Sequence, residues 1–337
     1  MNRKMGIKAL IATALVLAMC ISSLSVINGA LAAQQDTRGE LILKIAMQDD
    51  VQTLNVIAHN DVWSWHVLKY TYDSPMGTDP VTNELIPWIA IRSGDQPDRL
   101  FGCDYDPAYT NPDDPADHYN PRKVTVEYDF TGVKWHDGEQ VTIDDVLFST
   151  YVCALSPKYT TSFQCLMDLG GVGDTNFTRT HWLWIDKVYE SEDKLHAKLH
   201  FELQTNFALF YRSTLAPFLL PKHIWDQFGD PMLPPDEPGA MDFAALLDWD
   251  PRSPSEIVGC GAMKFVEWSP GAFAKTAKYD DFFYHQKPTI DGVLYKIYKT
   301  TDAATMALKT GEVDLVAWAI PPDYIPDLMD DPNIGIS

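Results

Sequence analysis

Basic residues are scarce in this chain. It has 26 Lys and Arg against 47 Asp and Glu in 337 residues, a formal net charge of −21 at pH 7. A surface of this charge repels nucleic-acid phosphates, and no basic stripe offsets it, so we exclude nucleic acid as a partner. Disorder is excluded as well, because 46% of the residues are hydrophobic and 12% aromatic, enough for a large core.

Motifs of nucleophilic and nucleotide chemistry are missing. The sequence has no Gly-x-Ser-x-Gly, no papain-type cysteine context and no phosphate-binding Gly-Lys-Ser/Thr loop. These absences exclude the hydrolase and nucleotidase classes that depend on them. A pair of carboxylates for glycoside hydrolysis stays open, because any two acids can meet in a fold without a local signal.

Metal-ligand patterns are weak. His196 and His200 have the spacing of a zinc pair on a helix, but apolar and polar residues alternate around them, which is typical of a strand. Four strand residues span about 13 Å, too far for both rings to hold one ion. The acids between Asp104 and Asp117 lack the spacing of an EF-hand, so we expect a solvated loop, with calcium as the alternative. We predict no metal site.

Long hydrophobic runs are confined to the N-terminus. Basic residues up to Lys8 precede an uncharged stretch that ends in the small residues Ala30 to Ala33. This layout predicts a secretory signal peptide at residues 1–33. A retained membrane anchor is the alternative, since the stretch is long enough to span a bilayer. We therefore expect the body of the protein outside the cytoplasm, in the periplasm or at the cell surface.

Cysteine is also rare. Beyond the predicted signal peptide only Cys103, Cys153, Cys165 and Cys260 remain, and no Cys-x-x-Cys spacing occurs. An even number of cysteines in an exported protein permits disulfides. We predict a disulfide between Cys153 and Cys165, with buried free thiols as the alternative.

What is present is a regular alternation of strand and helix patterns. Apolar periodicity predicts strands at 41–47, 124–130, 195–201, 293–298 and 313–318, and helices at 61–72, 142–154, 244–247 and 303–309. Thr142 and Asp145 have the spacing of a capping box. Residues 93–122 and 228–254 are rich in Pro and Asp and predict surface loops. An opening strand followed by a helix indicates an α/β layer.

Aromatic residues gather directly after the first predicted strand. Trp63 and Trp65 follow the polar segment of His59, Asn60 and Asp61. In α/β layers, ligands usually bind at the loops beyond the carboxyl ends of strands. Tryptophan suits recognition because its large contact area costs little conformational entropy. We predict that these five residues contact a ligand. The alternative is that one indole belongs to the core, since residues two apart cannot share a helical face.

Several segments resemble a known family. Residues 128–149, YDFTGVKWHDGEQVTIDDVLFS, are similar to the strand, Lys-aromatic-His-Asp-Gly turn and capped helix of the family 5 extracellular solute-binding proteins. These proteins are the peptide- and nickel-binding components of ABC importers. Other segments resemble further blocks of the family in the expected order, at 49–55, 78–88, 220–225, 259–268 and 307–315. Cys260 and Met263 depart from the pattern of their block.

The resemblance implies an α/β fold with the two-lobed clamp architecture of a type II periplasmic binding protein, in the style of family 5. The cleft between the lobes of such a clamp closes on its solute by hinge motion. We expect residues 34–270 in lobe one, including a variable subdomain, and residues 271–337 at the start of lobe two. Family members extend well beyond Ser337. We therefore expect a C-terminally truncated chain with an incomplete second lobe.

By analogy, ligand contacts of lobe one come from His59 to Trp65, and those of lobe two begin at Trp318. Family members that bind different ligands share the signature, so the signature cannot determine which ligand is bound. We therefore expect a structural role for its residues Trp135, His136, Asp137 and Gly138.

The implied function is that of the extracytoplasmic component that captures peptides and delivers them to ABC transporter permease subunits in the membrane. Such a protein is a monomer, is not an enzyme and needs no cofactor. The alternatives are a secreted carbohydrate-active hydrolase and a binding protein for oligosaccharides or nickel chelates.

Overall fold

The computed structural model describes residues 39–79, 81–82, 85–91, 102–105, 122–156, 185–189, 194–203, 218–233, 235–318 and 320–336. The predicted signal peptide and Cys165 lie outside these residues, so both stay predictions. The chain divides into a unit of residues 1–41 and a unit of residues 42–337, and the second unit is described below.

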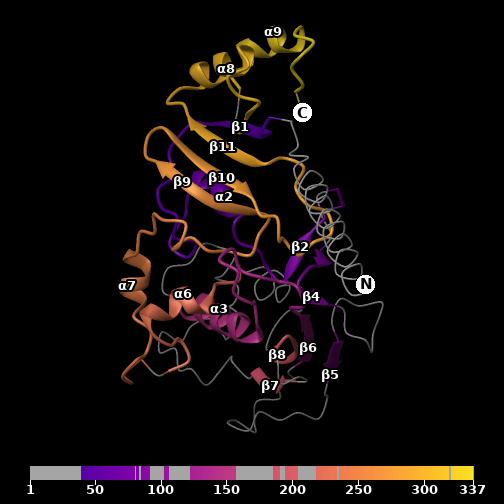
Figure 1. Cartoon of the computed structure of the whole chain (residues 1–337), viewed down its shortest axis with the longest axis vertical. Helices are drawn as coiled ribbons and strands as arrows, with labels where there is room; N and C mark the ends of the chain where they lie inside the picture. Colours follow the sequence, from indigo (N-terminus) through magenta and orange to yellow (C-terminus); the bar gives the residue numbers. More distant parts are fainter. Residues whose placement is uncertain are drawn as a thin grey trace, which may run out of the picture. The chain divides into compact units, whose positions relative to one another are not determined.

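A mixed five-stranded sheet contains the first strand of this unit. Its strand order is β12-β1-β11-β10-β9, with β1 at Ile42–Met47, β9 at Met263–Ser269, β10 at Phe273–Lys278, β11 at Gly292–Ile297 and β12 at Leu315–Val316 (Figure 1). Strand β1 pairs in parallel with both β11 and β12, whereas β10 is antiparallel to its neighbours. The carboxyl ends of β1, β11 and β12 therefore meet at one edge of the sheet.

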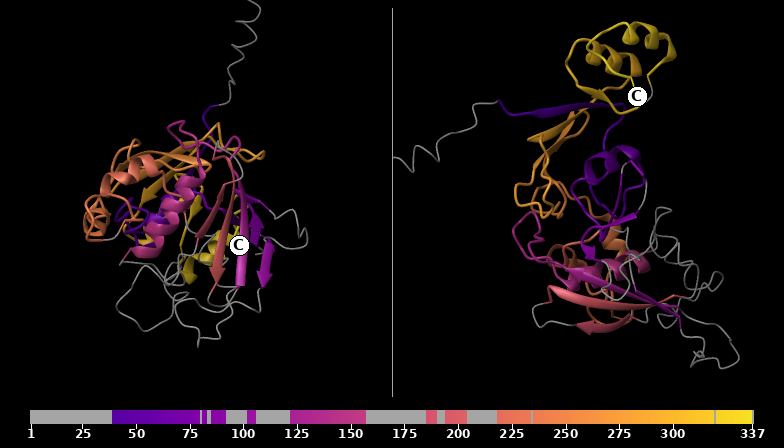
Figure 2. Two further views of the ribbon diagram at one scale, coloured as in Figure 1. Left: turned by 90° about the horizontal axis from the view of Figure 1, so that it is seen from below. Right: turned by 90° about the vertical axis from the view of Figure 1, so that its right-hand side faces the viewer.

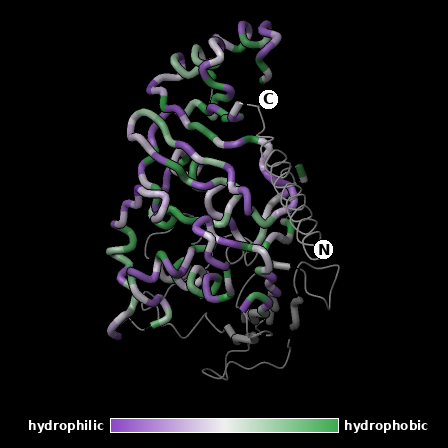
Figure 3. Tube along the Cα trace, in the orientation of Figure 1, coloured by the Kyte–Doolittle hydropathy of each residue, from purple (hydrophilic) through white to green (hydrophobic). Residues whose placement is uncertain are grey.

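Helices cover both faces of this sheet at β1. Helix α2 (Val62–Leu68) packs on the face that carries Ile45, in the largest core cluster. Helix α8 (Thr301–Lys309) packs on the opposite face against Ala46. Figure 2 shows the two helices on opposite sides of β1 in its right-hand view, and Figure 3 shows that α8 carries both hydrophobic and hydrophilic residues. Successive strand residues point to opposite faces, which explains this division.

A second sheet is antiparallel throughout. Its order is β4-β6-β8-β7, with β4 at Ala90–Ile91, β6 at Arg122–Asp129, β7 at Ile185–Tyr189 and β8 at His196–Leu203, and β5 (Gly102–Tyr105) pairs with the first half of β6. Strand β5 corrects the expectation of a continuous surface loop from 93 to 122. Gly102 and Asp104 give this short segment little intrinsic strand character, and its pairing with β6 supplies the stabilisation.

Helix α3 (Ile143–Leu155) packs with its first half in the core of the second sheet and with its second half in the largest core cluster. The predicted capping box is confirmed, since the Thr142 backbone N–H donates to Asp145 Oδ2 at 2.9 Å. The fully buried side chains of Phe130 and Trp135 belong to the core of the second sheet. The two cores meet where the chain crosses between them, and the Leu219 N–H donates to the Asp73 carbonyl at 2.8 Å at this crossing.

The remaining elements are short. They are β2 (Met76–Thr78), which pairs with β3 (Leu85–Pro87), α6 (Lys222–Trp225), η1 (Asp226–Phe228), α7 (Phe243–Asp248), η2 (Pro322–Tyr324) and α9 (Ile325–Met329). We expect the boundary between the lobes at residue 270. This boundary falls between β9 and β10, which pair with each other in one sheet. The division into lobes therefore stays a prediction.

His196 and His200 both lie on β8, as the alternation predicts. Within the described ranges, no cluster of three or more His, Cys, Asp or Glu side chains has the arrangement of a metal site. No helix in the same ranges has both the length and the apolar character needed to cross a bilayer.

Candidate ligand-binding site

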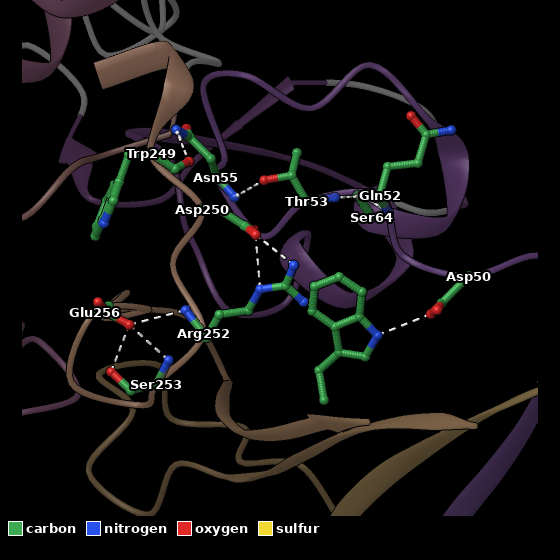
Figure 4. Close-up of polar contacts among 11 residues, drawn as sticks. Asp50, Gln52, Thr53, Asn55, Ser64, Trp249, Asp250, Arg252, Ser253 and Glu256 are labelled. Atoms are coloured by element: carbon green, nitrogen blue, oxygen red, sulfur yellow. Dashed lines mark hydrogen bonds and ion pairs between the residues drawn. The ribbon is translucent and has the colours of Figure 1, made fainter. Parts of the chain in front are cut away.

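The loop after β1 is tied to helix α2 by polar contacts. Asp61 is the N-cap, and its Oδ1 accepts from the backbone N–H groups of Trp63 at 3.0 Å and Ser64 at 2.7 Å. Ser64 Oγ in turn accepts from the backbone N–H groups of Gln52 and Thr53 (Figure 4). The loop is therefore fixed to the first turn of α2 at two places, at Gln52 and Thr53 and at Asp61.

A second set of contacts holds the same loop against the rest of the core. The Asn55 side chain accepts from the backbone N–H of Ile57 and donates to the carbonyl of Leu246. It also donates to the carbonyl of Trp249 (Figure 4). Asn55 is fully buried, so these bonds satisfy a polar group that would otherwise be costly in the core. The segment from β1 to α2 is thereby held in one conformation.

Asp50, three residues after the end of β1, is held from the opposite side. Its Oδ1 accepts from Trp268 Nε1 at 2.9 Å. The guanidinium of Arg252 lies 4.0 Å from the centroid of the Trp268 ring and pairs with Asp250 (Figure 4). This arrangement fixes the carboxyl end of β1 to β9.

The structure brings Trp63 and Trp318 together. Their ring centroids lie 5.4 Å apart at an interplanar angle of 56°. Trp63 packs against the largest core cluster, whereas Trp318, just beyond β12, keeps 51% of its surface exposed. His66 lies beside Trp63, with ring centroids 6.1 Å apart. One partly buried indole thus supports one that is largely open to a ligand.

Trp65 lies on another face of α2. It is 40% exposed, and its ring centroid lies 5.9 Å from that of His59 and 5.3 Å from that of Phe218. Trp63 and Trp65 therefore occupy different faces, as their spacing requires, and each keeps part of its ring outside the core. Asn60 is exposed beside them.

Two buried polar atoms at this place find no hydrogen-bond partner in the described part of the chain. They are Nδ1 of His59, a side chain only 9% exposed, and Oδ2 of Asp61. Burial lowers the pKa of His59, and the nearby Asp61 carboxylate opposes that effect. The imidazole is accordingly neutral at pH 7. A neutral imidazole can accept a hydrogen bond at one ring nitrogen, and a carboxylate accepts at both oxygens.

A cavity of about 770 Å³ adjoins the aromatic cluster. Its lining includes His66, Lys69, Tyr70, Tyr295 and Trp318. The Tyr295 hydroxyl donates to the His66 carbonyl at 2.8 Å, which joins β11 to the end of α2. Burial lowers the pKa of His66, and the charge of Lys69 lowers it further. The volume lies within the range of small-molecule sites.

The four signature residues form a turn that supports other backbone segments. Trp135 is fully buried, and its carbonyl accepts from the Tyr279 hydroxyl at 2.9 Å. Asp137 contacts His223 Nε2 at 2.7 Å, and Gly138 has a φ of +98°, which favours glycine.

The His136 ring bridges two glycines. Gly259 N–H donates to its Nδ1 at 3.3 Å, so the opposite nitrogen, Nε2, carries the proton that bonds the Gly261 carbonyl at 2.8 Å. Burial lowers the pKa of His136 to about 4. None of the four signature residues lines the cavity described above. The geometry supports the expected structural role, which stays a prediction.

Cys153 is fully buried, and Cys165 lies outside the described residues, so their pairing stays a prediction. Cys260 is a buried free thiol.

Sequence reasoning did not assign a role to Lys69 or Phe218. Lys69 lies three positions after His66, a helical spacing that places both on one side and that a search for basic residues near the aromatics could have found. Phe218 reaches Trp65 only because the chain returns between the two cores, and no local pattern signals that return.

Comparison with known proteins places this chain in a family. The family model described as bacterial extracellular solute-binding proteins, family 5 Middle, matches residues 131–337. The oligopeptide-binding protein AppA of Bacillus subtilis is 29% identical over 184 residues, which are 54% of this chain and 28% of AppA.

Solved structures share the fold. AppA of Bacillus subtilis in complex with a nonapeptide has a TM-score of 0.54 and 21% identity, covering 86% of this chain and 46% of that one. NikZ of Campylobacter jejuni in complex with Ni(L-His) has a TM-score of 0.53 and 19% identity, covering 88% and 46%. The chain thus spans less than half of these proteins. The predicted α/β fold of the two-lobed periplasmic binding proteins is confirmed.

The family resemblance of the signature segment is confirmed too, because the matching region covers more than half of the chain. The chain belongs to family 5 of the bacterial extracellular solute-binding proteins.

Proposed function

We propose that this protein is the extracytoplasmic component of an ABC importer that captures peptides and hands them to membrane permease subunits. The observation that carries the proposal is the Trp63 and Trp318 pair, a partly exposed aromatic surface beyond the carboxyl ends of β1 and β12. Such surfaces stack on peptide planes and apolar side chains without requiring one sequence. Family membership and the peptide named with AppA agree with this choice.

The polar atoms beside the indoles favour a ligand rich in N–H groups. Asp61 Oδ2 is an acceptor only, and His59 Nδ1 belongs to an imidazole kept neutral by burial. A peptide offers an ammonium group and backbone amides to these atoms. An anionic solute would instead place like charges close to Asp61, which is unfavourable. We expect the N-terminal end of a peptide to lie at this position.

Titration calorimetry of the full chain with three solutes tests the ligand class. Tetra-alanine, maltotetraose and Ni(L-His) represent a peptide, an oligosaccharide and a nickel chelate. We expect saturable binding of one tetra-alanine per chain and none of the other two. Mass spectrometry of the recovered peptide checks for turnover, and we expect it intact. Binding of maltotetraose or the nickel chelate alone, or the appearance of cleaved product, would contradict the proposal.

We also expect a monomer that acts without a cofactor. Light scattering during gel filtration measures the mass in solution. A stable dimer at micromolar concentration would contradict the first expectation, and loss of peptide binding after dialysis against EDTA would contradict the second.

A further inference from the structure

The cavity beside Trp318 has a charge opposite to that of the whole protein. Among the described residues, its lining contains two basic side chains, Lys69 and His66, and no Asp or Glu. The chain as a whole carries a formal net charge of −21. The acids that give the chain its negative charge are therefore missing from the described lining of this cavity, and a charged group that enters it meets a cation.

Lys69 supplies that cation. It is the C-cap residue of α2, and its Nζ lies 4.8 Å from the ring centroid of Tyr70, another lining residue. Among the described residues, no carboxylate lies within ion-pair distance of Lys69. Four other lysines, by contrast, each form an ion pair with an acid: Lys194, Lys278, Lys296 and Lys309. Since burial holds His66 neutral near pH 7, the ammonium of Lys69 is the only full charge among the described residues that line the cavity.

The rest of the wall is mostly apolar, with Thr289 and the phenol rings of Tyr70 and Tyr295 as its other polar residues. Side chains of four strands and of the loop before β11 contribute, and they include Leu43, Ile45, Met263, Ile290, Val293 and Leu315. Leu315, like Tyr70 and Trp318 at the rim, is about half exposed. Exposed apolar groups of this size around a cavity are typical of a binding site.

The two ends of α2 carry opposite polarity. The unpartnered Oδ2 of Asp61 lies before its first turn, and Lys69 follows its last turn. At about 1.5 Å per residue these positions are separated by about 12 Å along the helix. An extended peptide of three or four residues spans about this distance at roughly 3.4 Å per residue. Its carboxylate would then meet Lys69, and its ammonium group would lie toward Asp61, which does not itself line the cavity.

We propose that this cavity binds an apolar group that carries a carboxylate, with the carboxylate against Lys69 and the apolar part against the aliphatic wall. The C-terminal residue of a short hydrophobic peptide and a free N-acyl amino acid present the same chemistry. The inference rests on the proposed function, because Trp318 belongs both to the aromatic cluster and to the cavity.

Calorimetry of the full chain with Ala-Ala-Leu, its C-terminal amide and N-acetyl-leucine tests this site. We expect the free tripeptide to bind about tenfold more tightly than the amide, the ratio that corresponds to one charge-assisted contact. Lys69→Met should erase the difference, and Lys69→Arg should retain most of it. Lys275→Met is the matched control: it removes the same charge from β10, and Lys275 does not line the cavity.

The outcomes separate this site from the peptide function. Equal affinities for the acid and the amide, or a difference that survives Lys69→Met, would overturn the cavity proposal while peptide capture stands. Binding of N-acetyl-leucine that depends on Lys69, without any tripeptide binding, would support the cavity and overturn peptide capture. Absence of binding by all three compounds would overturn both.

Discussion

Trp63 and Trp318 lie with their ring centroids 5.4 Å apart, although one follows the first strand of the described chain and the other follows the last. Their contact is a consequence of sheet topology. Strand β12 pairs in parallel with β1, so the segments that leave both carboxyl ends emerge at one edge of the sheet. Ligand sites of α/β proteins form at such edges.

The Asp61 cap determines how rigidly the aromatic cluster is held. Asp61→Ala removes the acceptor of two backbone N–H groups at the start of α2, and we expect the free energy of unfolding to fall by about 1 kcal/mol. Urea denaturation measures this change. Asp61→Asn keeps an acceptor oxygen and serves as the control, with a loss of less than half that size. Equal losses in the two variants would argue against the capping role.

Gly261 is required by a close approach of two backbones. Its N–H donates to the Thr71 carbonyl at 2.9 Å, and a Cβ at this position would lie 2.4 Å from the Tyr70 carbonyl oxygen. Gly261→Ala should therefore lower the free energy of unfolding by roughly 3 kcal/mol, because the backbone must move. Gly335→Ala, where a Cβ meets nothing within 4 Å, is the control and should be neutral. Thermal and urea unfolding of both variants decide the point, and similar stabilities would contradict it.

His136 gives the protein a pH-dependent contribution to stability. Burial lowers its pKa to about 4 in the folded state, so between that value and 6.5 the unfolded chain binds a proton that the folded chain does not. Its stabilising contribution is complete above pH 6.5 and is lost as the pH falls toward 4. Relative to His136→Gln, the wild type should gain roughly 3 kcal/mol between pH 4 and 6.5.

The difference between the two proteins is the quantity to measure by urea denaturation at each pH. The wild-type curve alone does not isolate His136, because burial raises the pKa of Asp73 to about 7 and acts in the opposite direction over the same range. A difference that stays constant from pH 4 to 6.5 would show that the imidazole is not held neutral by the fold.

Local patterns predicted the elements whose stability is local. The Thr142 capping box and strands β1, β6, β8 and β11 lie within a few residues of the predicted positions, because caps and apolar alternation act over short distances. Strand β5 was missed because its residues become a strand only through pairing with β6. The helix predicted to continue to Tyr72 ends at Leu68. The carbonyl of Thr71 instead accepts from Gly261, a contact that no local pattern reveals.

The candidate site was predictable in part for the same reason. The aromatic residues after β1 were predicted to contact a ligand because they cluster beyond the carboxyl end of a strand. In the structure they lie in the first turns of α2. The cavity next to them was not found, because its walls come from strands that are far apart in the sequence and meet only in the sheet.

The affinity of the Trp318→Ala variant for tetra-alanine tests the central claim most directly. Trp318 is half exposed, so its removal should leave the melting temperature nearly unchanged while it weakens peptide binding by about tenfold or more. Met329→Ala removes a more exposed apolar side chain of α9, which does not line the cavity, and should bind as the wild type does. Wild-type affinity in a folded Trp318→Ala protein would contradict capture at the Trp63 and Trp318 pair.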